Sequence, residues 1–165
     1  MDLLVQADQE FVKRYPELDG QRRGPLLPGI RFLLARLGAA TVGCCALQKG
    51  GDPFTKDTYE VKRLFVIPGA RGSGAADALM ISIESLASEI GAKLLCFETG
   101  TRQPEAIHVV LRHGYTPVKP YSPYYDDPFA RCFDDFLEVR IGHASFGKIR
   151  ANAEDADRRL HVLCS

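Results

Sequence analysis

The segment 71–76 has the residue types and spacing best suited to chemistry in this chain. Its sequence, Arg-Gly-Ser-Gly-Ala-Ala, lies between an apolar stretch that stops at Pro68 and a long run with helical spacing. The first amides of a helix have no partner within the helix and lie at the positive end of its dipole. Gly72 and Gly74 lack a Cβ atom, so an anion can approach those amides closely. The segment therefore predicts a phosphate or pyrophosphate site with Arg71 as a charged contact, and a structural turn without a ligand is the alternative.

Two well-known phosphate-binding loops do not fit this spacing. A Walker loop needs a lysine directly after its second glycine, where this chain has Ala75. A dinucleotide-binding loop needs a small residue three positions after Gly74, where Asp77 stands, and it belongs near the start of a βαβ unit. The segment here follows several predicted strands in the middle of the chain, so both classes of nucleotide site are excluded.

The elements that must position this segment can be predicted from hydrophobic spacing. Apolar residues three and four apart predict a long helix from Ala76 to Ile90, closed by Gly91. A second helix is expected over 104–113, with Pro104 in its first turn. Strands are expected over 3–5, 30–36, 40–47, 58–67, 93–99, 115–119 and 131–139, and a short N-terminal helix over 8–15. This order predicts an α+β domain in which helices cover one mixed sheet.

The polar tail over 141–165 is expected to be separate from a domain that spans 1–140. Ala153, Ala156, Leu160 and Leu163 keep helical spacing after Asn152, which is a candidate cap. We therefore expect the tail to be weakly ordered or to form a short docked helix.

Composition limits the remaining classes of protein. The chain has 165 residues, of which 45% are hydrophobic and 25% charged, as is typical of one globular domain. Its 21 basic and 21 acidic residues give a formal net charge of +0, so we expect no nucleic-acid partner. The most apolar stretch, 30–47, contains two arginines and two glycines, and no signal peptide precedes it, so we expect no membrane span.

The cysteines and histidines do not form a metal-binding pattern. The five cysteines are odd in number and no two have the C-x-x-C spacing of zinc or redox sites. The four histidines form no HExxH motif. We therefore expect no metal site, and free thiols in a reducing compartment, the cytoplasm.

The segment 71–76 and its surroundings resemble a known family. The pattern R-G-x-G-x-A after Val66-Ile67-Pro68 is similar to the acyl-CoA-binding motif of the GNAT superfamily of N-acetyltransferases. Five further segments match that family in the expected order, including its fourth and fifth strands and its GF/GY turn: 60–66, 98–100, 103–107, 113–115 and 123–133. The last of these resembles a small bacterial-type subgroup. The match covers 1–140, which a glycine-rich loop alone would not explain, and the tail lies outside it.

This resemblance implies a mostly antiparallel sheet with helices on both faces and a V-shaped opening between the fourth and fifth strands. Acetyl-CoA would be the co-substrate, with its pantetheine on the backbone of 64–66 and its pyrophosphate on the amides of 71–76. A small-molecule amine would enter from the opposite side, between the loop 17–29 and the aromatic loop 120–130. The residues implied to contact acetyl-CoA are Leu64, Phe65, Val66, Arg71, Gly72, Ser73, Gly74, Ala75, Ala76, Gln103 and Ala106.

Acetyl transfer to an amine needs a base, because an alkyl ammonium with a pKa of about 10.4 is not a nucleophile. Glu60 and Glu98 lie on the strands beside the implied opening and are the candidate bases, directly or through water. Each could instead be a strand residue in an ion pair. Tyr121, Tyr124 and Asp126 are the candidates to hold a cationic amine through ring faces and a carboxylate. The same loop could instead simply cover the edge of the sheet.

One position departs from the family's pattern. Many members carry a tyrosine four residues before the glycine of the GF turn, where it protonates the departing thiolate, and here Val110 takes its place. His108, Tyr115 or Tyr121 could replace this acid, although we expect His108 to be exposed and Tyr115 to lie in the core. Solvent could also protonate the thiolate, or the protein could bind CoA with little catalysis.

The sequence thus predicts an acetyl-CoA-dependent N-acetyltransferase that acetylates a primary amine of a small molecule by direct attack in a ternary complex. The alternative is a catalytically weak CoA-binding or protein-interaction module with a degenerate active site. The oligomeric state is left open, with a homodimer as one candidate.

Overall fold

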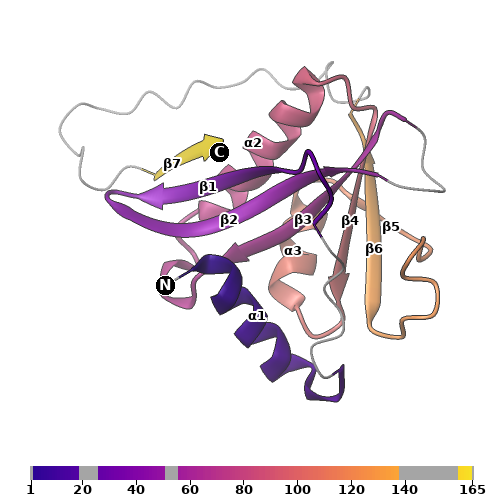
Figure 1. Cartoon of the computed structure of the whole chain (residues 1–165), viewed down its shortest axis with the longest axis horizontal. Helices are drawn as coiled ribbons and strands as arrows, with labels where there is room; N and C mark the ends of the chain where they lie inside the picture. Colours follow the sequence, from indigo (N-terminus) through magenta and orange to yellow (C-terminus); the bar gives the residue numbers. More distant parts are fainter. Residues whose placement is uncertain (1, 19–25, 51–55, 138–159, 165) are drawn as a thin grey trace.

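The computed structural model describes residues 2–18, 26–50, 56–137 and 160–164, and within them seven strands form one sheet with three α-helices packed on it (Figure 1). The strand order across the sheet is β5-β6-β4-β3-β2-β1-β7. In chain order the elements are α1 (Leu3–Arg14), β1 (Arg31–Leu37), β2 (Ala40–Lys49), β3 (Thr58–Val66), α2 (Ala75–Glu89), β4 (Leu94–Gly100), α3 (Pro104–Arg112), β5 (Thr116–Val118), β6 (Ala130–Phe136) and β7 (Leu160–Cys164).

Every neighbouring pair of strands is antiparallel except β3 and β4, which are parallel. These two strands pair only from Thr58↔Leu94 to Val61↔Phe97. Beyond that point they diverge, because β3 continues beside β2 while β4 continues beside β6 (Figure 1). The predicted mixed, mostly antiparallel sheet with a V-shaped opening is therefore confirmed. Its two arms are β3 and β4, the strands that the resemblance counts as fourth and fifth.

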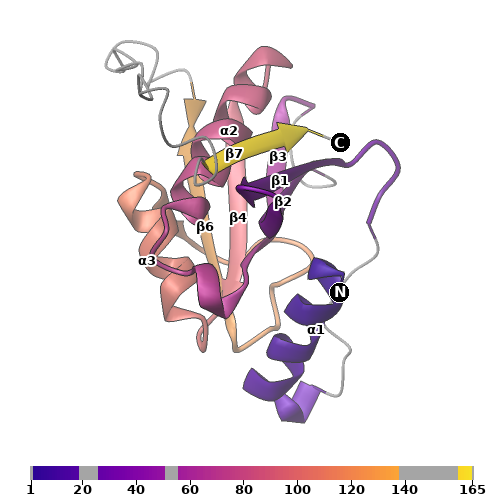
Figure 2. The ribbon, with the colours of Figure 1, turned by 90° about the vertical axis from the view of Figure 1, so that its left-hand side faces the viewer.

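The helices cover both faces of the sheet, as predicted. α2 and α3 lie on one face and α1 lies on the other (Figure 2). α2 contributes Leu79, Met80 and Ile83 to the main core, and each of these residues has 0% of its surface exposed. Burying a side chain of this size contributes about 1.5–3 kcal/mol. The main core thus holds α2 firmly on the sheet, with its N-terminus directly after the glycine-rich turn.

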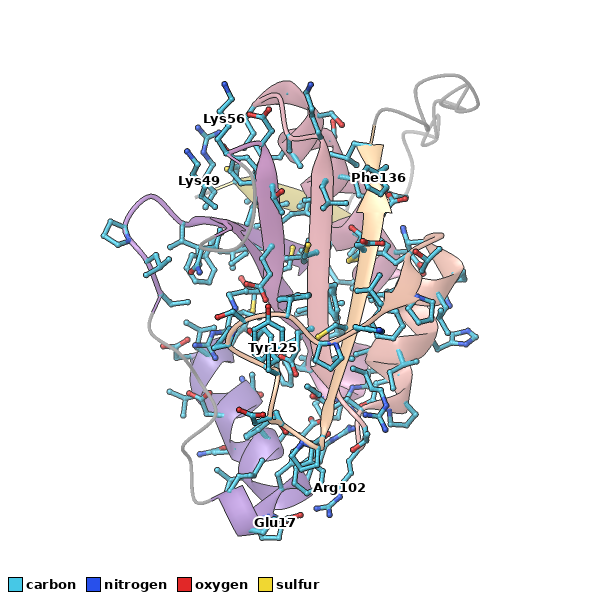
Figure 3. All side chains as sticks on the ribbon, turned by 90° about the vertical axis from the view of Figure 1, so that its right-hand side faces the viewer. Glu17, Lys49, Lys56, Arg102, Tyr125 and Phe136 are labelled. Atoms are coloured by element: carbon cyan, nitrogen blue, oxygen red, sulfur yellow. The ribbon has the colours of Figure 1, made fainter. Side chains whose placement is uncertain are left out.

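A smaller core lies on the opposite face, under the loop 120–129 between β5 and β6. Cys96 of β4 and Cys132 of β6 pack there against Tyr121. Figure 3 shows this loop crossing the face of the sheet, with Tyr125 in front. The aromatic loop therefore covers the same face as α1. None of the described helices has the length and apolar character needed to cross a membrane.

The N-terminal segment differs from its prediction. A strand is expected over 3–5, but α1 already begins there, and Asp2 caps it by accepting a hydrogen bond from the Leu4 amide (3.0 Å). Leu4, Ala7 and Phe11 repeat at helical spacing, and Ala7 is buried. A run of three apolar residues is too short to distinguish the period of a strand from that of a helix.

The helix expected in the C-terminal tail is wrong for the part that the structure describes. Leu160 and Leu163 lie in β7, which pairs with β1 from Leu37↔Leu160 to Leu33↔Cys164. The edge of β1 would otherwise present unpaired backbone groups, and pairing with β7 satisfies them. Asn152, Ala153, Ala156 and the expected domain boundary at 140 lie outside the described residues. The other elements begin and end within three residues of their predicted limits.

Candidate active site

A bulge in β3 opens the site. Opposite β2, the register moves from Cys44↔Phe65 to Ala46↔Lys62, so β3 has an extra residue at this point. Arg63 absorbs it with a φ of 58°, and among the described residues it is the only non-glycine with a positive φ. Such a conformation costs on the order of 1 kcal/mol and is typical of functional sites. The bulge turns the last residues of β3 away from β4 and leaves the β4-facing backbone edge of β3 open.

The glycine-rich turn connects this open strand to α2. Gly72 and Gly74 have φ values of 82° and 86°, a left-handed region that L side chains rarely adopt. A Cβ atom built on either glycine would meet nothing within 4 Å, so open space lies in front of the turn. Gly74 is the N-cap of α2 and has no side chain to cap it, so the first amides of a 15-residue helix face this space.

The space in front of the turn is a cavity of about 510 Å³ between the end of β3, the turn and α3. Ser73, which was predicted to contact acetyl-CoA, does not line it. The other ten predicted contacts do: Leu64, Phe65, Val66, Arg71, Gly72, Gly74, Ala75, Ala76, Gln103 and Ala106. Sequence reasoning missed Val109 and Arg112, which also line it. Ala106, Val109 and Arg112 follow one another at intervals of three residues, so they lie on the same face of α3, and this face lines the cavity.

Arg71 lies at this cavity within a cluster of four charged residues. Its guanidinium contacts the carboxylates of Glu10 (2.6 Å) and Glu105 (3.8 Å), and its Nε donates to the Val66 carbonyl (3.2 Å). Arg14 of α1 contacts the same two carboxylates. Burial alone would raise the pKa of Glu105, but the hydrogen bond from Arg14 and the charges of both arginines hold it below its usual value. The cluster thus joins α1, the turn and α3 at the edge of the cavity.

A second cluster fixes the opposite wall of the cavity by tying α3 to α2. Asp77 accepts a hydrogen bond from Arg112 Nε (3.1 Å) and lies 3.0 Å from His113 Nε2, while His113 Nδ1 lies 3.4 Å from Glu84. The hydrogen bond to Glu84 raises the pKa of His113. Burial lowers this pKa, but Asp77 raises it further, so the net shift is upward. Burial alone would raise the pKa of Asp77, but Arg112 and His113 lower it. Since the Arg112 guanidinium pairs with Asp77, this carboxylate opposes an anion near the start of α2 less than an unpaired one would.

A smaller cavity of about 110 Å³ opens toward the α1 face of the sheet. Glu60, Glu98 and Tyr124 all line it, so the structure brings together both candidate bases and one candidate substrate contact. Tyr121 is buried behind Glu60, and Asp126 is exposed on the loop and lines neither of the two cavities.

Glu60 is enclosed by hydrogen-bond donors. Only 7% of its surface is exposed, and its Oε1 accepts from Tyr124 Oη (3.1 Å) and Tyr121 Oη (3.4 Å). Its Oε2 lies 2.9 Å from Lys62 Nζ, which also donates to Tyr124 Oη (2.8 Å). Burial, together with the charge of Glu60, raises the pKa of both tyrosines, so their hydroxyls stay protonated at neutral pH.

Val110, at the position where many members of the family carry a tyrosine, has no access to either cavity. Val110 has 0% of its surface exposed, packs in the main core and lines neither of the two cavities. Tyr115 is buried in the same core, and the exposed His108 lines the larger cavity. Tyr124, which sequence reasoning did not consider as an acid, lines the smaller cavity. Lys62, also missed, was detectable because it alternates with Glu60 along one strand.

The two cavities meet at the opening between β3 and β4, because Leu64, Gln103 and Ala106 line both of them. The larger one reaches the glycine-rich turn and the smaller one reaches the two glutamates. Gln103 is held in place at this junction, where its Oε1 accepts from the Gly100 amide (3.1 Å) and from Thr99 Oγ1 (3.2 Å). One long ligand and one small ligand could therefore meet in the opening.

Comparison with known proteins agrees with this geometry. A family model described as "Acetyltransferase (GNAT) domain" matches residues 28–117. A protein of Azospirillum brasilense named IAA acetyltransferase is 38% identical over 137 residues, which cover 78% of this chain and 87% of that protein.

Solved structures give the same result for the fold. One assigned as an acyl-CoA N-acyltransferase, from Klebsiella pneumoniae subsp. pneumoniae, has a TM-score of 0.60 and 27% identity, covering 79% of this chain and 91% of the other. A GNAT-family structure from Desulfovibrio desulfuricans has a TM-score of 0.56 at 20% identity, covering 78% of each chain, and supports the fold alone. On the family model, the 38% identical relative and the shared fold, the chain belongs to the GNAT family and is an N-acetyltransferase.

Proposed function

We propose that the protein transfers an acetyl group from acetyl-CoA to the primary amine of a small molecule, by direct attack in a ternary complex. The observation that carries this proposal is the junction of the two cavities at Leu64, Gln103 and Ala106. Direct transfer requires both substrates to be present at one point, and orienting them there accounts for much of the rate enhancement. The name of the Azospirillum relative supports acetyl as the group transferred.

The residues of the larger cavity fit acetyl-CoA. The uncapped amides at the start of α2 would hold the pyrophosphate, because they lie at the positive end of the helix and face open space. Arg71 lines the same cavity and would exchange part of its contact with Glu10 and Glu105 for the phosphate oxygens. The backbone of 64–66, which lies beyond the end of the pairing with β4, would pair with the amide groups of the pantetheine. Acetyl-CoA, when bound, supplies an activated acetyl thioester at the junction of the cavities.

Glu98 is the stronger candidate for the base that removes the amine proton. Glu60 already interacts with Lys62 and two tyrosines, so its carboxylate is committed to holding those groups. Glu98 lines the same cavity from β4, on the other arm of the opening. The backbone amides near the β3 bulge would donate to the oxyanion that develops during attack. The hydroxyl of Tyr124 would turn its one proton from Glu60 to the departing sulfur, while Lys62 continues to donate to the same oxygen.

This proposal is tested by measuring thiol release from acetyl-CoA with a panel of small amines, with mass spectrometry of the product. We expect at least one amine to be acetylated with a kcat on the order of 1 s⁻¹ or more, which is the usual range for enzymes. Thiol release that never exceeds the rate without an amine would overturn the proposal.

An N-acetyltransferase with only weak turnover is the second candidate, and the buried Val110, which cannot protonate a thiolate, favours it. Restoring tyrosine at this position is a poor test, because a larger side chain in a filled core costs about 1–3 kcal/mol. The thiol-release assay separates the two candidates directly, since a weak enzyme would bind acetyl-CoA with little turnover.

A further inference from the structure

Charged side chains of opposite sign lie on the two arms of the β3–β4 opening. We infer that the acceptor is a zwitterion, an amine that also carries a carboxylate, as a free amino acid does. This inference rests on the proposed function and narrows its substrate class. The carboxylate would contact Lys62 on β3, and the ammonium group would approach Glu98 on β4.

The strand register places these two residues on one face of the sheet, across the opening. Glu60 pairs with Cys96 in the parallel ladder, and two residues further along each strand come Lys62 and Glu98. Side chains alternate along a strand, so all four residues point to the face that the aromatic loop covers. Pairing ends at Val61↔Phe97, so the strands separate where the two charged residues stand.

Lys62 is held in position to bind an anion. Its ammonium group has three donors, and its contacts among the described residues are Glu60 Oε2 (2.9 Å) and Tyr124 Oη (2.8 Å). One donor therefore remains for a ligand. The side chain is 21% exposed and lines the smaller cavity. The buried Glu60 thus fixes the direction of Lys62, while the cation still faces the acceptor space.

Glu98 supplies the opposite charge to the same space. Its carboxylate lies close enough to Tyr124 and Cys132 that its charge contributes to the raised pKa of both groups. Tyr124, which accepts from Lys62 Nζ (2.8 Å), lines the same cavity as Glu98. An ammonium group near Glu98 would be adjacent to the junction with the larger cavity, where the thioester would lie.

The size and composition of the cavity limit the acceptor further. Its volume of about 110 Å³ suits a small molecule, since one water in the liquid takes about 30 Å³. Phe11 of α1 supplies an apolar contact on one side. Arg63 also lines the cavity, so the two cations Lys62 and Arg63 and the two carboxylates Glu60 and Glu98 face one acceptor that carries both charges.

The test compares acceptors that differ only in the carboxylate. The twenty amino acids are screened by thiol release, and the best one is compared with its α-amide and with its decarboxylated amine. We expect kcat/KM for the amino acid to exceed that for the amide by about tenfold or more. The amide is the stricter control, because its amine loses a proton more readily than the amine of the free acid does.

Variants then test the role of Lys62. Lys62→Gln should reduce the ratio of kcat/KM between the amino acid and its amide to near one, and Lys62→Arg should keep most of it. Lys49→Gln is the matched control, because Lys49 is exposed at the far end of β2 (Figure 3), and it should leave the ratio unchanged. The ratio is measured within each variant, so a general loss of activity does not change it.

Each possible result of these experiments supports or overturns a specific part of the inference. Equal or faster acetylation of the amide or the decarboxylated amine would overturn the zwitterion inference and leave the proposed function standing. A preference for the amino acid that persists in Lys62→Gln would overturn the assignment of Lys62. The absence of thiol release with every acceptor would overturn the proposed function, and this inference with it. The wild-type comparison decides the substrate class even if Lys62→Gln does not fold.

Discussion

At the residue scale, the two glutamates of the opening differ in their surroundings. Glu60 accepts from two tyrosines and a lysine, whereas Glu98 lines the same cavity from the other arm of the opening. A general base contributes typically 10²–10⁴-fold to a rate. We therefore assign deprotonation to Glu98 and positioning of Lys62 to Glu60.

Replacing the base should slow the reaction without weakening cofactor binding. We expect Glu98→Gln to lower kcat by about 100-fold, because the amide has no proton-accepting charge. The Kd of acetyl-CoA, measured by calorimetry, should not change. Glu89→Gln removes an exposed carboxylate on α2 and should have no effect on either quantity. A Glu98→Gln enzyme with wild-type kcat would refute this assignment.

The hydroxyl of Tyr124 can be tested with an adjacent control. Tyr124→Phe removes the group that joins Lys62 to Glu60 and that we expect to donate to the departing sulfur. Loss of such a donor should lower kcat by about tenfold or more. Tyr125→Phe changes a ring that is 61% exposed and should not alter steady-state kinetics. Equal effects of the two substitutions would show that Tyr124 has no specific role.

At the scale of elements, we expect the contact between α2 and α3 to depend on pH. His113 lies between Glu84 and Asp77, which raise its pKa in the folded protein above the value in the unfolded chain. The stabilisation is therefore fully present below the unfolded pKa of about 6.5 and is lost as the pH rises through the higher folded value. Thermal unfolding of His113→Gln should thus show a larger loss of stability at pH 5.5 than at pH 8.5.

The neighbouring His108 provides the control for this prediction. It is exposed on the same helix, so His108→Gln should leave the free energy of unfolding unchanged at both pH values. A loss of stability in His113→Gln that is the same at the two pH values would show that the ion pairs with α2 contribute nothing.

The end of β4 is fitted closely against α1. A Cβ atom at Gly100 would lie 2.0 Å from Tyr15 Oη, and this hydroxyl accepts a hydrogen bond from the Arg102 amide (2.7 Å). We expect Gly100→Ala to destabilise the fold by about 1–3 kcal/mol, because the buried ring must move. Gly69→Ala should be neutral, since a Cβ atom there meets nothing within 4 Å. Equal melting temperatures of these two variants would contradict the close packing.

At the scale of the whole molecule, the cofactor side of the site could be predicted and much of the acceptor side could not. The strand end, the glycine-rich turn and α2 follow one another along the chain, so their local spacing fixes the cavity that they form. The acceptor cavity depends on contacts between distant segments. Only the β3–β4 register and the path of the aromatic loop bring Lys62, Glu98 and Tyr124 together.

The ends of the chain show the same limit of sequence prediction. Leu160 and Leu163 are spaced as they would be on one face of a helix, but they form a strand because they pair with β1. Segment 3–5 is too short to reveal its period, and its place in α1 depends on the packing of that helix on the sheet. Tertiary context thus overrides local pattern where the local signal is weak.

Calorimetric titration measures whether the amides at the start of α2 bind the pyrophosphate of acetyl-CoA, on which the proposed function depends. Ala76→Glu places a carboxylate at this position, where the helix tolerates an acidic residue, and Ile81→Glu adds the same charge on the exposed side of α2. We predict that wild type and Ile81→Glu bind acetyl-CoA with the same Kd and that Ala76→Glu binds at least about tenfold more weakly, a loss of about 1.4 kcal/mol. Unchanged affinity in Ala76→Glu, or no binding by the wild type at millimolar acetyl-CoA, would contradict the claim.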